Sequence, residues 1–90
     1  MSDLRIWKDT VSVLEDTVIS MPDNAQILHV REQNDEVCMW AIGDTTGRLV
    51  DRVFTVIGTG HQCPIQNSRY VGTAFTENGT YVWHVFEVTS

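Results

Sequence analysis

β-branched and aromatic residues dominate the chain, and turn-forming residues interrupt them about every ten positions. This pattern predicts an all-β protein, a small antiparallel sandwich or barrel-like sheet of about seven short strands with little or no helix. The runs expected to form strands are Leu4–Lys8, Thr17–Met21, Ala25–Gln33, Glu36–Ile42, Leu49–Ile57, Tyr70–Phe75 and Thr80–Val88. Val11, Leu14 and Val18 have helical spacing, so one helical turn between the first two runs is an alternative.

Turn residues separate these runs in recognisable ways. Met21-Pro22-Asp23-Asn24 should end the second strand, because proline cannot donate to a strand ladder and Asp-Asn favours turns. Asn34-Asp35 should form a tight hairpin, since both residues tolerate positive φ. Glu77-Asn78-Gly79 predicts the last hairpin, because Asn-Gly between strand-like runs is a strong hairpin signal. A loop is expected from Thr59 to about Arg69, with Cys63-Pro64 inside it.

Three of the predicted strands carry apolar residues on both faces, whereas a half-buried strand normally alternates apolar and polar positions. These strands are Glu36–Ile42, Leu49–Ile57 and Thr80–Val88. A thin sandwich buries only the inner face of each sheet, so the surplus apolar face needs a covering helix or another subunit. We therefore expect a homo-oligomer. The residues expected at its interface are Trp40, Trp83, Val85 and Phe86.

The chain has 90 residues, of which 42% are hydrophobic, so we expect a single globular domain over residues 1–90. Its formal net charge is −6, with only six Lys or Arg residues, and these are dispersed. Binding to DNA or RNA depends on clustered cations, so direct nucleic-acid binding is not expected. The acidic balance favours solubility, and an acidic protein could also occupy a basic partner.

The first residues, Met1–Arg5, are polar and do not resemble a signal peptide. No stretch approaches the roughly 20 apolar residues of a membrane helix, so we expect a cytoplasmic protein without membrane contact. Cys38 and Cys63 are too few for a disulfide framework, although a disulfide between them stays open.

The tetrad Gly58-Thr59-Gly60-His61 is the strongest candidate for chemistry, because it directly follows the longest strand-like run. Glycines can adopt positive φ and turn successive N–H groups to one side, which forms an anion-binding nest. The Thr59 hydroxyl and His61 could add hydrogen bonds to a phosphate or carboxylate. Arg52 could join them only if its strand folds back, and Tyr70 could offer a stacking ring. The alternative is a glycine-rich bulge at the end of a strand, in which His61 caps local carbonyls.

Other chemistry has weaker support. His61 and Cys63 are a close pair, but a structural zinc site normally shows two such pairs, so we expect no metal and no cofactor. The same two residues lack an obvious third group to orient a thiolate–imidazole couple. We therefore expect no enzymatic activity.

Several sequence blocks together resemble a family of small tailed-phage proteins of unknown function. The blocks are Ile6-Trp7-Lys8, Met21-Pro22, Ala25-Gln26-Ile27-Leu28, Met39-Trp40-Ala41, Gly58-Thr59-Gly60-His61, Tyr70-Val71-Gly72-Thr73 and Val82-Trp83-His84-Val85-Phe86-Glu87. The resemblance implies a phage or prophage origin, and hence action in the cytoplasm of a bacterial host. It brings no catalytic residues, and the loop from Gln62 to Arg69 departs from the pattern.

These observations favour an accessory binding protein that sequesters a host factor. In the most specific version of this hypothesis, the host factor is a small phosphorylated ligand, such as a nucleotide immune signal, because the glycine-rich loop suits an anion. One alternative is an acidic inhibitor that binds a basic host enzyme. Another is a structural component of the virion or of its assembly.

Overall fold

The computed structural model describes residues 2–63 and 66–89, so Pro64 of the predicted loop lies outside the described residues. Within these ranges the chain forms seven strands and no helix, which confirms the all-β prediction. The strands are β1 (Leu4–Val11), β2 (Thr17–Pro22), β3 (Gln26–Gln33), β4 (Glu36–Asp44), β5 (Leu49–Gly58), β6 (Ser68–Thr76) and β7 (Tyr81–Val88). Each strand overlaps one predicted run, and β1 differs most because it continues to Val11.

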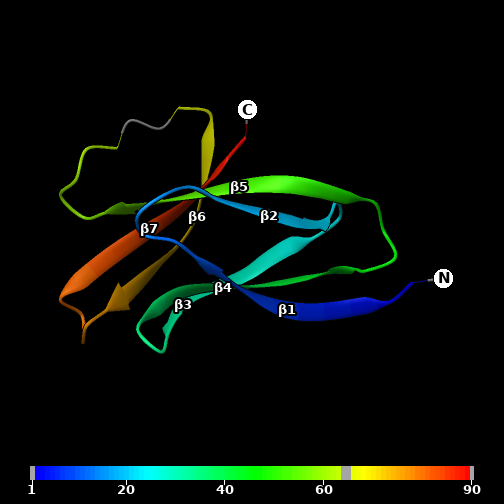
Figure 1. Ribbon diagram of the computed structural model, residues 1–90, viewed down its shortest axis with the longest axis horizontal. Helices are drawn as coiled ribbons and strands as arrows, with labels where there is room; N and C mark the ends of the chain where they lie inside the picture. Colours follow the sequence, from blue (N-terminus) through cyan, green and yellow to red (C-terminus); the bar gives the residue numbers. More distant parts are fainter. Residues whose placement is uncertain (1, 64–65, 90) are drawn as a thin grey trace.

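The strands form two antiparallel sheets that stack as a sandwich (Figure 1). One sheet has three strands in the order β1-β4-β3, and the other has four in the order β2-β5-β7-β6. The molecule measures 45 × 29 × 16 Å, and its shortest dimension suits two layers, because packed sheets lie about 10 Å apart.

Both predicted hairpins are confirmed. Asn34 and Asp35 join β3 to β4 with φ values of 53° and 62°, as a tight turn with two left-handed residues requires. The β6–β7 connection is one residue longer than the predicted triplet, and Glu77, Asn78 and Gly79 all have positive φ. The remaining strand pairs, β1–β4, β2–β5 and β5–β7, join segments that are distant in the sequence.

The chain leaves regular strand structure on both sides of β2. Pro22 ends β2, an edge strand, and its carbonyl accepts a hydrogen bond from the Ala25 N–H at 2.9 Å. Residues 12–16 form an irregular loop in which the Ser12 hydroxyl accepts from the Leu14 N–H at 3.0 Å. The helical turn considered for this region does not form, because the loop's backbone bonds with a local side chain instead.

The hydrophobic core lies between the two sheets. Its buried members come from both layers: Val11, Met21, Val30, Val37, Met39, Phe54, Ala74 and Val85. The pairing of Phe54 with Glu87 and of Val56 with Val85 places these side chains of β5 and β7 on the inner face. Alternate residues of the same strands therefore point outward.

The edges of the two sheets approach each other closely where β3 faces β6. A Cβ atom on Gly72 would lie only 2.7 Å from both Cβ and Cγ2 of Val30. Each edge strand also contains an irregularity, between Ile27 and His29 in β3 and between Tyr70 and Gly72 in β6. Bulges of this kind protect strand edges from pairing with other chains.

Gly72→Ala should lower the free energy of unfolding by about 1–3 kcal/mol, because the added methyl group overlaps Val30. Urea denaturation would measure the change. In a Val30→Ala background the loss of unfolding free energy should be smaller, since Cγ2, one of the two overlapping atoms, is absent. An equal cost in both backgrounds would contradict this close contact.

Candidate functional site

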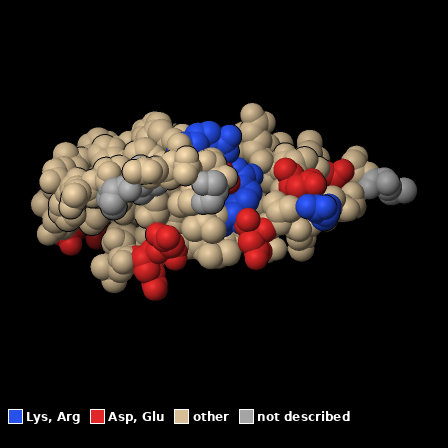
Figure 2. Space-filling view, turned by 90° about the horizontal axis from the view of Figure 1, so that it is seen from above, with Lys and Arg blue, Asp and Glu red and all other residues tan. Residues whose placement is uncertain are grey.

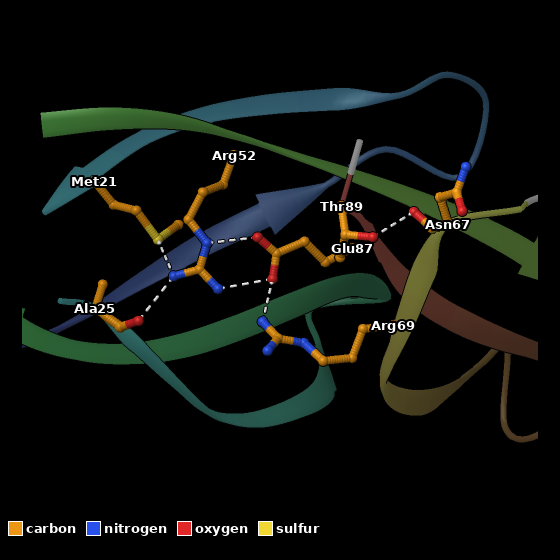
Figure 3. Close-up of polar contacts among 7 residues, drawn as sticks. All are labelled: Met21, Ala25, Arg52, Asn67, Arg69, Glu87 and Thr89. Atoms are coloured by element: carbon orange, nitrogen blue, oxygen red, sulfur yellow. Dashed lines mark hydrogen bonds and ion pairs between the residues drawn. The ribbon is translucent and has the colours of Figure 1, made fainter. Parts of the chain in front are cut away.

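Two arginines share one carboxylate on the inner face of the four-stranded sheet (Figure 3). Arg52 binds Glu87 with both prongs of its guanidinium: Nε donates to Oε2 at 2.6 Å, and Nη2 donates to Oε1 at 2.7 Å. Arg69 Nη2 donates to the same Oε1 at 2.6 Å. The Glu87 carboxylate thus accepts three charged hydrogen bonds, which are about twice as strong as neutral ones.

The sheet register brings these three side chains together. β7 lies between β5 and β6, and Glu87 is the direct partner of Phe54 on one side and of Arg69 on the other. Arg52 precedes Phe54 by two residues, so it lies on the same face of β5. All three side chains therefore meet on the inner face of the four-stranded sheet.

Arg52 has further contacts that hold its guanidinium in place. Nη1 donates to the Ala25 carbonyl at 2.8 Å and lies 3.4 Å from Sδ of Met21. The guanidinium also lies 5.9 Å from the centre of the Phe54 ring. The side chains of Arg52 and Glu87 are only 13% and 9% exposed, whereas that of Arg69 is 64% exposed. Arg52 is thus the anchored arginine, and Arg69 faces solvent.

The three groups reinforce one another's charges. The hydrogen bonds from Arg52 hold the pKa of Glu87 below its ordinary value; burial opposes this shift, and Arg69 adds to it. The hydrogen bond to Glu87 raises the pKa of Arg52, against the effect of burial. Two positive groups surround one negative group, so this site carries one surplus positive charge in a chain of net charge −6.

A hollow of about 260 Å³ opens beside this cluster. It is lined by Ala25, Gln26, Ile27, Arg52, Arg69, Tyr70 and Val71. Its volume is below the roughly 300–1,000 Å³ of pockets that enclose a drug-sized ligand, so it suits a single anionic group. Figure 2 shows that basic side chains on the face seen from above form two small groups rather than a continuous surface. On this face the positive charge is therefore confined to these two groups of side chains.

The Gly58–His61 loop is a turn that closes the end of β5. Thr59 N–H donates to the Val82 carbonyl, and His61 N–H donates to the Gly58 carbonyl, both at 3.0 Å. Gly60 has a φ of 87°, which a glycine adopts readily. Because two of these N–H groups already have internal partners, the predicted nest of successive outward N–H groups is wrong. The backbone here fits the alternative of a glycine-rich strand end.

The predicted ligand-binding residues separate into two groups. Arg52 and Tyr70 line the hollow, but the Gly58–His61 loop does not. Gly58 lies six positions beyond Arg52 on the same continuous strand, a distance of roughly 20 Å, and β5 does not fold back. Arg52 therefore lines the hollow, and its side chain is too far from the Gly58–His61 loop to bind a ligand there.

A chain of polar side chains connects the loop with Tyr70 across the outer face of the four-stranded sheet. Thr59 Oγ1 lies 2.6 Å from His84 Nε2, and Thr73 Oγ1 lies 3.1 Å from His84 Nδ1. The Tyr70 hydroxyl hydrogen-bonds to the same Thr73 oxygen. Both ring nitrogens of His84 therefore have partners within the chain.

The model of one protein family matches residues 2–90, nearly the whole chain. The chain belongs to the DUF7352 family. This family is described as a domain of unknown function. No curated protein and no solved structure matches the chain significantly.

Sequence reasoning missed two central residues of this DUF7352 domain, Arg69 and Glu87. A signal for Glu87 exists in the sequence, because it continues the alternating series of Trp83 and Val85. A carboxylate on the core side of a strand requires a charged partner. Nothing in the sequence identifies that partner, since Arg52 and Arg69 lie 35 and 18 residues away.

The four residues expected at one oligomer interface lie on three different surfaces, so that prediction is wrong as a set. Val85 is fully buried in the core, and Trp83 packs against the core with its indole N–H bonded to Thr76 at 2.8 Å. Trp40 lies on the outer face of the three-stranded sheet, in register with His29, and Phe86 lies on the outer face of the other sheet. Strand pairing, which the sequence does not reveal, decides which apolar face points inward.

The described ranges contain no group of three or more His, Cys, Asp or Glu side chains placed to hold a metal. Cys38 is buried and Cys63 is exposed, and both are free thiols. No helix in residues 2–63 and 66–89 is long and apolar enough to cross a membrane.

Glu87→Gln should destabilise the protein by roughly 2–4 kcal/mol at neutral pH, because it leaves the largely buried Arg52 without the carboxylate that pairs with it. The lowered pKa of Glu87 means that its contribution is complete above the ordinary carboxyl pKa of about 4.5 and is lost as the pH falls through the folded-state value. The variant should therefore lose less stability than the wild type on acidification. Denaturation at a series of pH values would measure this, with exposed Glu36→Gln as the control. Identical acid dependence in Glu87→Gln and the wild type would contradict the assignment.

Proposed function

We propose that this protein is a non-enzymatic binding protein that sequesters a small phosphorylated ligand, such as a nucleotide signal, at the hollow beside Arg52 and Arg69. The observation that carries the proposal is the surplus positive charge, because two guanidiniums share the single carboxylate of Glu87. The planar guanidinium is the side chain best suited to bind the oxygens of a phosphate.

The residues around the hollow have different roles in this proposal. Arg69 is mostly exposed, and its one side-chain hydrogen bond within the described chain goes to Glu87, so its other N–H groups can reach a phosphate. Arg52 is held by Glu87 and Ala25, and it contributes a fixed positive field. Tyr70 lies exposed at the rim, where its ring can stack on a base outside the hollow.

The side chains that line the hollow suit the binding of a ligand rather than its chemical conversion. Its described residues offer cationic donors and an aromatic ring rather than a nucleophile beside a base. Sequestration requires only affinity for the ligand. The Gly58–His61 loop stays outside this site, and its predicted part in ligand binding would have to be a separate contact.

The biological setting is also part of the proposal. The motif blocks that resemble small tailed-phage proteins support a phage origin and action in the cytoplasm of a bacterial host. There, capture of a nucleotide signal would act against host defence. The small size of the hollow supports recognition of a phosphate group in particular.

Titration calorimetry with a panel of nucleotides, cyclic nucleotides and inorganic phosphate would test the proposal. Arg69→Gln should weaken binding of the best ligand by about 10- to 100-fold, the loss expected for one charged hydrogen bond. Arg31→Gln, at an exposed arginine on the other sheet, should leave the affinity unchanged. Saturable binding of no member of the panel, or equal losses in both variants, would refute the site.

A second candidate function is inhibition of a basic host protein. The β3–β4 and β6–β7 turns meet where the Glu77 N–H donates to Asp35 Oδ1 at 2.8 Å, and Glu36 lies beside them. The highly exposed Leu14 belongs to the adjoining loop. Acidic groups around an exposed apolar side chain fit a basic protein partner.

Capture of a host protein would distinguish the two candidates. Under the second one, high salt and Glu36→Gln combined with Leu14→Ser should release the partner, whereas Arg69→Gln should retain it. If capture of the host protein is lost in Arg69→Gln alone, the anion site is favoured.

A further inference from the structure

The outer face of the four-stranded sheet is a second apolar surface, which we call the open face. Its apolar side chains are Val18, Val53, Ile57, Phe75, Val82 and Phe86, and the register of β2, β5, β6 and β7 places them on one side. Val18 and Phe75 are 60% and 56% exposed. No strand among residues 2–63 and 66–89 packs over this side, because the three-stranded sheet covers the opposite one.

The open face is almost free of charge. Charged residues make up 20% of the chain, yet the outward strand positions of this sheet include only one charged side chain, Asp51, which lies at the end of β5 away from β7. The outer face of the other sheet differs, since it carries Lys8 and Arg31. In a chain with a net charge of −6, a face with few acidic groups is the one that can meet a second copy with the least like-charge repulsion at the contact.

The polar groups at the centre of the open face are already hydrogen-bonded within the chain. His84 uses both ring nitrogens, with Thr59 and Thr73, and the Tyr70 hydroxyl bonds with Thr73. Covering a polar group is costly mainly when it loses its partners. An apolar surface could therefore cover this face without leaving His84 or Tyr70 unpaired.

The size of the open face meets the minimum for a specific contact. β2 lies beside the first half of β5 and β7 beside the second half, and strands of these lengths, with a rise of about 3.3 Å per residue and a spacing of about 4.8 Å, cover a flat area of roughly 500 Å². Protruding side chains increase the accessible area, so two such faces together bury about 1,000 Å² or more. This is the lower range of specific protein–protein interfaces.

We propose that two copies of this chain pack open face against open face to form a two-fold symmetric homodimer. Each face, which carries few charges, meets an identical face, and the two sheets stack as the layers of a sandwich do. This interface uses neither Arg52 nor Arg69 of the anion site, although Tyr70 belongs to both surfaces. Dimerisation would therefore place the rims of the two hollows at the margins of the interface.

Sedimentation velocity and light scattering over a concentration series would test the dimer. The wild type should have twice the 10.2 kDa mass of the chain. Phe75→Asp and Val18→Asp should each reduce the mass to that of one chain, because two-fold symmetry places two new charges in the interface. Ile6→Asp changes an equally exposed side chain, 61%, on the outer face of the other sheet and should stay dimeric.

Two results would overturn the proposal: a wild type that is monomeric at every concentration, or dimers that persist in both open-face variants. The substituted side chains are exposed in the single chain, so circular dichroism should show an unchanged fold. Comparing the two variants also protects the test against a folding defect in one of them. Phosphate affinity should survive in Val18→Asp monomers, which separates this test from that of the anion site.

Discussion

The two-pronged ion pair between Arg52 and Glu87 is the interaction on which one half of the sandwich depends. Glu87 occupies an inward position of β7 where an apolar residue would be expected, so it requires a charged partner. Arg52 supplies this partner and also reaches Ala25, which precedes β3 in the other sheet. One guanidinium therefore connects the two layers through directed hydrogen bonds, in addition to the apolar core.

The same pair makes the candidate site possible. Because Arg52 satisfies both oxygens of Glu87, Arg69 adds a second positive charge without being fully engaged. The site is also preorganised, since the sheets hold Arg52 and Glu87 before any ligand arrives. The ion pair and the proposed anion-binding surface are thus parts of one arrangement. The Gly58–His61 loop, which attracts attention in the sequence, uses its backbone to close a strand instead.

The outer faces of the two sheets have different chemistry. One carries Lys8 and Arg31 among its apolar residues, whereas the other is apolar with an internally bonded His84. The surplus of apolar residues in the sequence is therefore divided between the two outer faces, and the face of the four-stranded sheet carries fewer charged side chains. The hollow opens at an edge of this sheet, so ligand binding and self-association can coexist.

Local signals in the sequence determined the strand content, the positions of the strands in the described part of the chain and the left-handed residues of the turns, such as Asn34-Asp35. These features depend on steric preferences of neighbouring residues, which a sequence displays directly. Only the tertiary structure decided the strand order, the inward position of Trp83 and Val85, and the partners of Glu87. Pairing between distant strands decides which of two apolar faces is buried and which charges meet. That choice depends on the sum of many long-range contacts, and no short segment records it.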